Sequence, residues 1–366
     1  MKKQPNKRKH RFIRFFFRLL GTIVLAVILL AAGLLAFLSL TEFKPAEQET
    51  TEITGKAKKT LAAGDSLSIL TWNIGYGALG DNADFFMDGG KMVRTADVER
   101  INSNLEEIVT EILSVKPDVV FLQETDSNSA RSYYVDEYAY IQDDLERYCA
   151  SFAPNFKVAF LPYPIPPIGK VESGLATFSA FNVTDAQRVQ LPVPFTWPMR
   201  MANLKRCLLV SRVPIKGSSK ELVLVNLHLE AYDDGEGKRA QTKMLADLLA
   251  VEAQKGNYVV AGGDFNQIFS SVDASAYPVQ KGNWKANTIE ESVFSGDWQF
   301  LMDPTVPSCR SLYRPYAGTD KASFQYYLID GFIVSGNCTI SSCKAEDLGF
   351  TASDHNPVIL QIRLEK

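Results

Sequence analysis

An uncharged apolar run near the N-terminus is the strongest constraint on how this chain folds. Residues 19–40 are 22 positions without a charged side chain, mostly Leu, Ile, Val, Ala and Gly. At 1.5 Å per residue, a helix of that length spans roughly 33 Å, which is enough to cross a bilayer core. The apolar stretch of a secretory signal is usually only about 7–15 residues long. We therefore expect an uncleaved transmembrane helix, with a cleaved signal as the alternative.

The charges that flank this run indicate its orientation. Residues 1–18 carry eight of the 39 Lys and Arg residues and no acid, which leaves 31 basic against 42 acidic residues in the remainder. Basic residues beside a transmembrane helix favour the cytoplasmic side. We expect a single-pass protein of the cell membrane with residues 1–18 as a basic cytoplasmic tail and the rest outside the cytoplasm. The acidic body argues against strong non-specific binding of polyanions.

The remainder of the chain is predicted to contain a linker and one large domain. Residues 41–65 are rich in Thr, Glu, Lys and Ala and lack apolar periodicity, which is typical of a linker. In residues 66–366, helical patterns at 97–115, 136–150 and 237–254 are separated by many strand-like runs rich in β-branched and aromatic residues. This order predicts a sheet-on-sheet core covered by helices.

The five cysteines do not form a metal-binding pattern. None of them belongs to a C-x-x-C motif, and their odd number leaves at least one thiol unpaired within the chain. Cys338 and Cys343 are close enough in sequence to pair in an oxidising compartment. Their odd separation would place them on opposite faces of one strand, which argues against that pairing.

Six clusters of polar residues follow apolar strand-like runs, at the places where a fold presents a site. Both histidines of the body belong to these clusters. Carboxylates and amides without thiols favour a hard cation such as Mg²⁺ or Mn²⁺. Together with imidazoles they suit the hydrolysis of a phosphate ester. The clusters are Asn73, Gln123-Glu124, Asn226 with His228, Gly262-Gly263-Asp264-Phe265-Asn266, Asp330, and Ser353-Asp354-His355-Asn356.

The same segments, taken in order, resemble the endonuclease/exonuclease/phosphatase family. They read LTWNIGYG, VVFLQET, LVNLHLE, AGGDFNQ, YLIDGFIVS and SDHNPV, and they cover about residues 67–364. The resemblance implies an α/β fold, a four-layered α/β sandwich with two mainly antiparallel sheets, here preceded by one transmembrane helix. It also implies metal-dependent cleavage of phosphate esters by a deoxyribonuclease- or sphingomyelinase-like member.

The resemblance also implies roles for individual residues. Glu124 resembles the principal metal carboxylate, Asn73 resembles the residue that supports metal and phosphate, and Asp354 is a further metal candidate. Asp264 would orient or deprotonate the attacking water, and Asn266 would hold the phosphate beside it.

The remaining catalytic candidates include both histidines. His355 would contact the scissile phosphate, and Asp330 would fix the tautomer and charge of His355. His228 is similar to the second histidine of the deoxyribonuclease and sphingomyelinase branches. Arg206 is a weaker candidate for a phosphate contact, with an ordinary strand residue as the alternative.

Two departures from the family pattern bear on the substrate. Some nucleases carry a second acid two positions after the first Asn, where this chain has Gly75. Inositol-phosphate 5-phosphatases have Asp-Arg where this chain has Asp330-Gly331, which disfavours that class. Two Pro-rich and aromatic segments, residues 161–168 and 191–199, either pack on the body or form a rim that meets lipid or a base.

These observations predict a membrane-anchored, divalent-metal-dependent phosphoesterase. A phosphodiesterase that acts on a phospholipid head group is favoured by the anchor, the acidic body and the apolar segments. An extracellular nuclease acting on DNA or RNA is the main alternative, and a catalytically silent binding module on the same fold is a third. The expected partners are a phosphate-ester substrate and the membrane, and no protein partner can be inferred.

Overall fold

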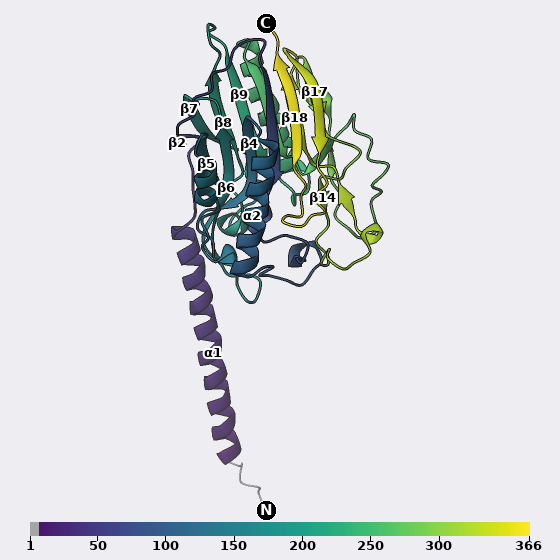
Figure 1. Ribbon diagram of the computed structural model, residues 1–366. Helices are drawn as coiled ribbons and strands as arrows, with labels where there is room; N and C mark the ends of the chain where they lie inside the picture. The colour runs from purple at the N-terminus through teal and green to yellow at the C-terminus, as the bar shows by residue number, and fades with distance from the viewer. Residues whose placement is uncertain (1–6) are drawn as a thin grey trace, which may run out of the picture.

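The N-terminal part of the chain is one long helix. The computed structural model describes residues 7–366, and in it α1 runs from Lys7 to Leu40 and projects away from the body (Figure 1). The most apolar 18-residue stretch of its segment His10–Leu40 has a mean hydropathy of 2.9, so by length and composition the helix can cross a membrane, as can many signal sequences. The helix starts before the uncharged run because the preceding basic residues continue it. The first six residues of the predicted basic tail lie outside the described part.

The body contains two seven-stranded mixed sheets. The first has the order β1-β7-β8-β9-β10-β16-β13, and within it only β9 and β10 are parallel neighbours. The strands are β1 (Gln48–Thr50), β7 (Asp185–Gln190), β8 (Cys207–Pro214), β9 (Glu221–His228), β10 (Tyr258–Asp264), β16 (Asp330–Ser335) and β13 (Trp298–Leu301).

The second sheet has the order β17-β18-β3-β4-β6-β5-β2, with β3 and β4 as its one parallel pair. The strands are β17 (Cys338–Ala345), β18 (Val358–Leu364), β3 (Ser66–Asn73), β4 (Val119–Asp126), β6 (Gly169–Ser179), β5 (Cys149–Leu161) and β2 (Ile53–Gly55). Two short pairs, β11 (Gln267–Phe269) with β12 (Asn287–Ile289) and β14 (Cys309–Arg310) with β15 (Tyr326–Tyr327), lie in the loops.

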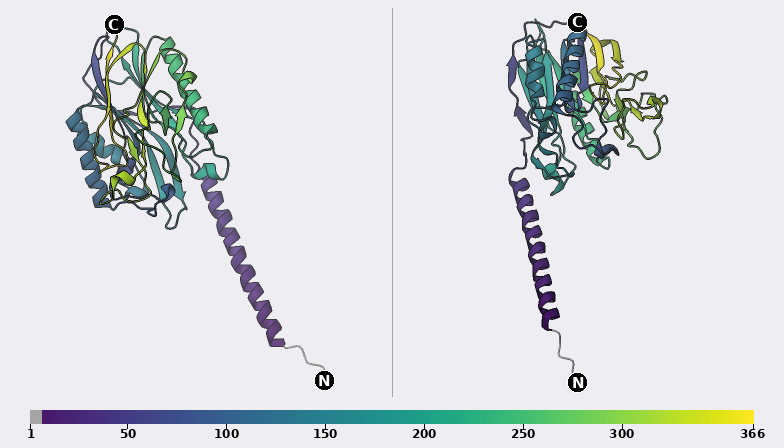
Figure 2. Two further views of the ribbon diagram at one scale, coloured as in Figure 1. Left: turned by 90° about the vertical axis from the view of Figure 1, so that its right-hand side faces the viewer. Right: turned by 60° about the horizontal axis from the view of Figure 1, so that its bottom comes forward.

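Three helices cover the outer faces of the sheets. The helices α2 (Val98–Val115) and α3 (Glu137–Asp144) pack on the second sheet, and α4 (Glu236–Gln254) packs on the first. Figure 2 shows α2 and α4 on opposite sides of the paired sheets. The structure therefore confirms the predicted α/β sandwich of four layers with two mainly antiparallel sheets.

The apolar core between the sheets changes into a polar layer at one end. Side chains alternate between the two faces of a strand. In β10, Tyr258 and Val260 face the core between the sheets, and Asp264 follows on the same face. In β3, Leu67 and Ile69 face this core. The same period of two continues to Asn73 in β3, Gln123 in β4, Asn226 and His228 in β9, and Asp330 in β16.

The structure differs from the sequence-based expectations in two elements. Residues 41–65, expected as a linker, include β1 and β2, which extend both sheets by pairing with β7 and β5. Backbone pairing at a sheet edge needs no apolar periodicity, so the sequence pattern did not reveal these strands. The helix expected at 136–150 ends at Asp144, because the chain turns there and starts β5 at Cys149.

The argument that Cys338 and Cys343 lie on opposite faces of a strand was wrong. The pairing of β17 with β18 shifts register between Ile340 and Ser342, and such a bulge inserts one residue into the strand. Both cysteines therefore contact the core between the sheets. All five cysteines in residues 7–366 are nevertheless free thiols.

Candidate active site

The carboxylate of Asp264 lies at the centre of the polar layer. Asp264 ends β10, where it is paired with His228 of β9 on one side and Asp330 of β16 on the other. Its Oδ2 accepts a hydrogen bond from Asn73 Nδ2 at 3.1 Å and lies 3.4 Å from His228 Nε2 and 3.9 Å from His355 Nε2. Burial and the negative charge of Asp330 raise the pKa of Asp264 to about 7. This carboxyl group is therefore poised to exchange a proton near neutral pH.

His355 and Asp330 form a buried pair. The Nδ1 of His355 lies 2.8 Å from Asp330 Oδ2, and both residues are at least 95% buried. Burial disfavours a charged imidazole, but the charge of Asp330 and its hydrogen bond outweigh burial and hold the pKa of His355 well above its ordinary value. His355 is therefore an imidazolium whose Nε2 points toward Asp264.

His228 differs from His355 in charge. Burial, together with the positive charges of Arg206 and His355, lowers the pKa of His228 well below its ordinary value. Its Nδ1 is buried without a hydrogen-bond partner among the described residues. The site thus presents one neutral and one charged imidazole, and both lie beside the Asp264 carboxylate.

Arg206 lies next to this group but contacts protein atoms. Its Nε is 3.3 Å from Glu230 Oε2, and its Nη1 donates to the carbonyl oxygen of His228 at 3.2 Å. Both Arg206 and Glu230 are buried. These contacts make Arg206 a positioning group for His228 in this structure, whereas a contact with phosphate stays a prediction.

Asn73 and Glu124 meet on the other side of Asp264. The Asn73 amide donates to Glu124 Oε1 at 3.3 Å and accepts from the Gly75 N–H at 3.1 Å. Glu124 sits where the pairing of β4 with β6 shifts register, and it has a positive φ of 53°. A non-glycine residue with positive φ is unusual and is often found at functional sites, where the surrounding structure maintains it.

The acidic side chains near Glu124 fit a hard divalent cation. Asp354 Oδ1 is buried without a hydrogen-bond partner among the described residues. Burial raises the pKa of Asp354 to about 6 against the positive charges of His355 and Arg310, and the charge of Glu124 adds to the rise. Two carboxylates that repel each other are stabilised by a shared cation. Glu124 and Asp354, with the free lone pair of the Asn73 oxygen, would hold it.

Two neighbours of Asp354 restrict this corner further. A Cβ on Gly75 would lie 3.0 Å from Asp354 Oδ1 and 2.8 Å from the Leu79 Cβ, at a φ of +52°. The second acid found in some nucleases therefore has no room at this position. The Cys309 thiol lies near Asp354 and His355, but burial raises its pKa to about 12. A protonated thiol is a poor ligand, so the donors at this corner are oxygens.

Asn266 is held in place by the Asp264 carboxylate and by one backbone carbonyl. Its N–H donates to Asp264 Oδ1 at 2.8 Å, and its side chain donates to the carbonyl oxygen of Leu229 at 2.9 Å, with a positive φ of 51°. The structure thus brings together all nine residues predicted for the site at one end of the sheets. Their individual roles stay predictions.

Several residues that support the site have no recognisable signal in the sequence. Trp72 Nε1 donates to the carbonyl oxygen of His355 at 2.9 Å, and the Ser308 hydroxyl accepts from the Asp330 N–H at 3.1 Å. Arg131 forms two hydrogen bonds with Asp126, and its guanidinium lies 3.7 Å from the centroid of the Tyr76 ring. These contacts join distant segments, so no local pattern could reveal them.

A second group of polar residues connects the two sheets beneath the site. Asn226 Nδ2 donates to the carbonyl oxygens of Leu122 and Ala176, and its Oδ1 accepts from Gln123 Nε2 at 2.8 Å. Asn226 is fully buried. The alternation of β9 placed Asn226 on the face of His228, but only the structure shows that it bridges the sheets.

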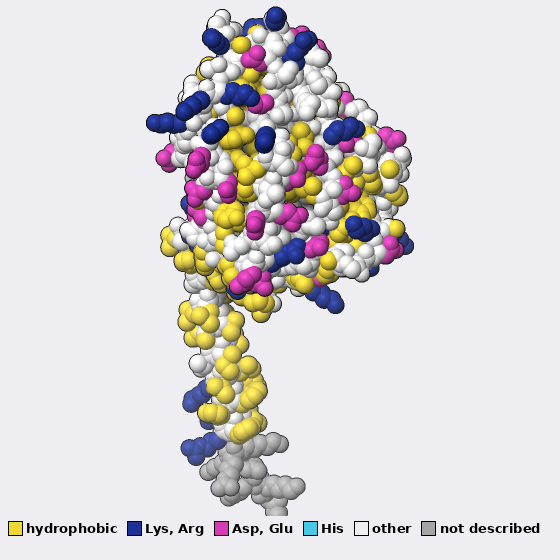
Figure 3. All heavy atoms as spheres, in the orientation of Figure 1, with side chains coloured by type: hydrophobic (Ala, Val, Ile, Leu, Met, Phe, Trp, Pro, Cys, Tyr) yellow, Lys and Arg dark blue, Asp and Glu magenta, His cyan; other side chains and the backbone are white. Residues whose placement is uncertain are grey.

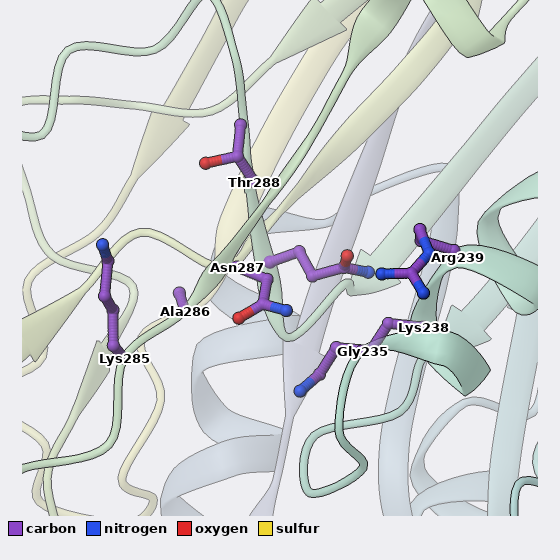
Figure 4. Close-up of a pocket in the computed structure, with 8 residues that line it drawn as sticks. Gly235, Lys238, Arg239, Lys285, Ala286, Asn287 and Thr288 are labelled. Carbon is purple, nitrogen blue, oxygen red and sulfur yellow. The ribbon is translucent and has the colours of Figure 1, made fainter.

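A basic pocket lies near the start of α4. It has a volume of about 330 Å³ and includes the side chains of Lys238, Arg239 and Lys285 (Figure 4). Lys238 is buried, with its Nζ 3.6 Å from an Asp233 oxygen, whereas Arg239 and Lys285 are exposed. Gln267 also lines the pocket and lies three residues after Asp264. The pocket thus offers positive charge beside the polar layer.

Comparison with solved structures supports the fold. A protein described as an endonuclease/exonuclease/phosphatase from Beutenbergia cavernae has a TM-score of 0.54 at 18% identity, covering 82% of this chain and 72% of that one. One from Bacteroides vulgatus has a TM-score of 0.52 at 16% identity, covering 82% and 100%. ANGEL2, described as a 2′,3′-cyclic phosphatase, has a TM-score of 0.52 at 15% identity, covering 87% and 99%.

The sequence comparison extends over most of the body. No curated protein sequence matched the chain. The sequence profile of the Endonuclease/Exonuclease/phosphatase family matches residues 70–355, a range that begins at Leu70 in β3 and ends at His355. This range includes every residue of the candidate site. The chain therefore belongs to the endonuclease/exonuclease/phosphatase family of phosphoesterases.

Proposed function

We propose that this protein is a membrane-anchored phosphodiesterase that depends on a divalent metal and acts on a phospholipid head group or a related ester. The observation that carries the proposal is the convergence of His228, His355 and Asn73 on one carboxylate oxygen of Asp264, with every distance at or below 3.9 Å. A buried carboxylate between two imidazoles provides both a base and charge stabilisation for the hydrolysis of a phosphate ester.

In this proposal the residues divide the work by their charge. Asp264 accepts the proton of the attacking water. With a pKa of about 7, a large fraction of this carboxyl group is ionised near neutral pH, and the ionised form is a stronger base than an ordinary carboxylate. His355, held as an imidazolium by Asp330, donates to the phosphoryl oxygens as negative charge develops. Neutral His228 and Asn266 orient the phosphate. A Mg²⁺ or Mn²⁺ ion held by Glu124, Asp354 and Asn73 would neutralise phosphoryl charge.

The proposed location rests on α1 and its contacts with the body. Leu38 is only 5% exposed, and Ser39 Oγ lies 2.9 Å from Met201 Sδ. Glu42 pairs with Arg200 at 2.9 Å and with Lys205 at 3.3 Å. Cleavage after residue 40 would remove the contacts of Leu38 and Ser39, whereas Glu42 would stay with its partners in the body. The contacts of Leu38 and Ser39 favour an uncleaved anchor, and the basic residues before the apolar run favour a cytoplasmic tail with the catalytic domain outside.

A nuclease and a catalytically silent binding module are the two alternatives to a lipid phosphodiesterase. A nuclease acting on extracellular DNA or RNA is favoured by the basic pocket at Lys238, Arg239 and Lys285, which would suit a second phosphate of a strand. A silent binding module would have no use for a base and an imidazolium at one point, so the complete arrangement around Asp264 argues against it.

A panel of substrates tests the proposal. The full chain in nanodiscs would be incubated with bis(p-nitrophenyl) phosphate, phosphatidylcholine or sphingomyelin vesicles, single- and double-stranded DNA, and RNA, each with Mg²⁺, Mn²⁺ or excess chelator. We expect metal-dependent release of product from the diester and from lipid vesicles. Cleavage of nucleic acid without cleavage of lipid would select the nuclease, and no turnover of any substrate would select the binding module.

A further inference from the structure

The candidate active site and the end of α1 lie at the same end of the body. The strands β3, β4, β9 and β10 all reach the site with their C-terminal ends. Their N-terminal ends meet at the opposite end, where the Tyr258 hydroxyl donates to the carbonyl oxygen of Glu365. Because β8 is antiparallel to β9, the segment between β7 and β8 lies at the site end, and α1 packs on that segment. Figure 1 shows α1 leaving the body opposite the C-terminus.

The C-terminal end of α1 packs directly on the body. The last turn of α1 contacts the β7–β8 segment: Trp197 Nε1 lies 3.3 Å from Ser39 Oγ, and Met201 lies 2.9 Å from the same atom. The uncharged part of α1 continues to Leu40, so the boundary of the hydrocarbon layer falls at this contact. The loops at the site end must then lie at the depth of the lipid head groups.

Large apolar side chains are exposed on several loops at this end. The group, called here the apolar rim, consists of Met87, Tyr163, Ile165, Trp197, Met199 and Tyr232, whose exposed fractions range from 49% to 92%. Figure 3 shows hydrophobic side chains around the base of the body, where α1 leaves it. Such a group of exposed apolar side chains in a protein body marks a contact surface.

The loops of the apolar rim contact one another. The Phe86 and Tyr163 rings meet edge to face with centroids 5.9 Å apart, which joins the loop after β3 to the hairpin between β5 and β6. The Tyr232 hydroxyl lies 3.3 Å from Asp88 Oδ1, which joins the loop after β9 to the loop after β3. The rim is therefore connected across the loops that follow the strands of the site.

We propose that the apolar rim docks on the outer surface of the bilayer that holds α1, so that the site takes its phosphodiester from lipid head groups of the same membrane. This inference rests on the proposed function and specifies its substrate class. Aromatic and aliphatic side chains at the end of a transmembrane helix favour the membrane interface. The acidic composition of the body disfavours a nucleic-acid strand as the occupant of the rim.

Fluorescence quenching by brominated lipids tests the docking without depending on activity. Ile165 is 92% exposed in the β5–β6 hairpin, and Val251 is 51% exposed near the end of α4 that leads into β10, at the opposite end of the body. The full chain carrying Ile165→Trp or Val251→Trp would be placed in nanodiscs with or without bromine on the acyl chains near the head groups. After subtraction of the wild-type signal, which includes Trp197 of the rim, we expect the tryptophan added at 165 to be quenched at least about threefold more strongly than the one added at 251. Equal quenching would overturn the docking.

Turnover of two substrates links the docking to the site. With the full chain reconstituted in phosphatidylcholine or sphingomyelin vesicles, the Tyr163→Ser and Ile165→Ser double variant should lose about tenfold in turnover of the lipid around it, because two apolar side chains no longer enter the interface. It should keep wild-type turnover of bis(p-nitrophenyl) phosphate, as should the control Leu113→Ser on α2. Loss of nucleic-acid cleavage with unchanged lipid turnover would assign the rim to stacked bases and overturn the inference. Failure of wild type on every diester would refute the proposed function, while the quenching result would still decide the docking.

Discussion

The Asp264 carboxylate illustrates how each residue of the site depends on its neighbours. In water this group would ionise near pH 4, but burial and Asp330 raise its pKa to about 7. The same Asp330 accepts a hydrogen bond from His355 and keeps that imidazole charged. One buried carboxylate therefore adjusts both the base and the cation of the proposed reaction.

A double-mutant cycle tests whether Asp330 acts through His355. His355→Ala removes the charge at the phosphate, so turnover of bis(p-nitrophenyl) phosphate should fall about 10²–10³-fold. Asp330→Asn should cost less, because it loosens only the orientation and charge of His355. The double variant should resemble His355→Ala, since the two residues act as one unit. Full multiplication of the two effects, with folding checked by circular dichroism, would show that Asp330 acts independently.

The pH profile gives a second view of Asp330. Activity should rise with pH as Asp264 ionises around pH 7 and fall only at alkaline pH, where His355 loses its proton. Asp330→Asn removes a negative charge that raises both pKa values, so both limbs should shift to lower pH. The measurement is kcat/KM against pH for wild type, Asp330→Asn and the exposed control Asp247→Asn. If the acidic and alkaline limbs of the Asp330→Asn profile stay in place or move to higher pH, the electrostatic role of Asp330 is contradicted.

The alternation of strand residues explains how much of the site the sequence predicted. Each cluster followed an apolar run in the sequence. Alternate residues of a strand face the same side, so Asn73, Asp264 and Asp330 face the space between the sheets, as the apolar residues of their strands do. Contacts that join distant segments, such as Trp72 with His355, were beyond a local pattern. The strands β1 and β2 were missed because their stability comes from edge pairing with β7 and β5.

Gly263 allows β9 and β10 to lie close together, which contributes to the stability of the fold. Its φ is +147°, and a Cβ there would lie 1.9 Å from the carbonyl oxygen of Leu227 on the neighbouring strand. Gly263→Ala should lower the free energy of unfolding by about 3 kcal/mol or more, because β9 and β10 would have to separate. Gly217→Ala, also at positive φ but with open space around it, should cost only about 1 kcal/mol. Thermal unfolding of both variants in nanodiscs measures the difference, and equal losses would refute the steric argument.

At the scale of the whole molecule, the acidic body and the basic N-terminus lie at opposite ends of one apolar helix. In the proposed arrangement the helix would hold the site end toward the membrane, and the sandwich places every proposed catalytic group at that end. The proposed topology of the chain can be tested independently of its reaction.

Protease treatment of intact cells tests the proposed topology. The basic residues before the apolar run predict a cytoplasmic N-terminus and an external body. Added protease should remove the body and leave a small membrane-bound fragment that carries an N-terminal tag. Complete protection of the body, in cells where a known external protein is digested, would place the catalytic domain in the cytoplasm.

Metal-dependent hydrolysis of a diester tests the central claim most directly. The full chain in nanodiscs would be assayed with bis(p-nitrophenyl) phosphate over a titration of Mg²⁺ or Mn²⁺ and in excess chelator. We predict that chelator abolishes turnover and that added metal restores it. Asp264→Asn should lower the restored rate by about 10²–10⁴-fold, whereas the exposed control Asp247→Asn on α4 should match wild type. Undiminished turnover in chelator, or in Asp264→Asn, would contradict the account.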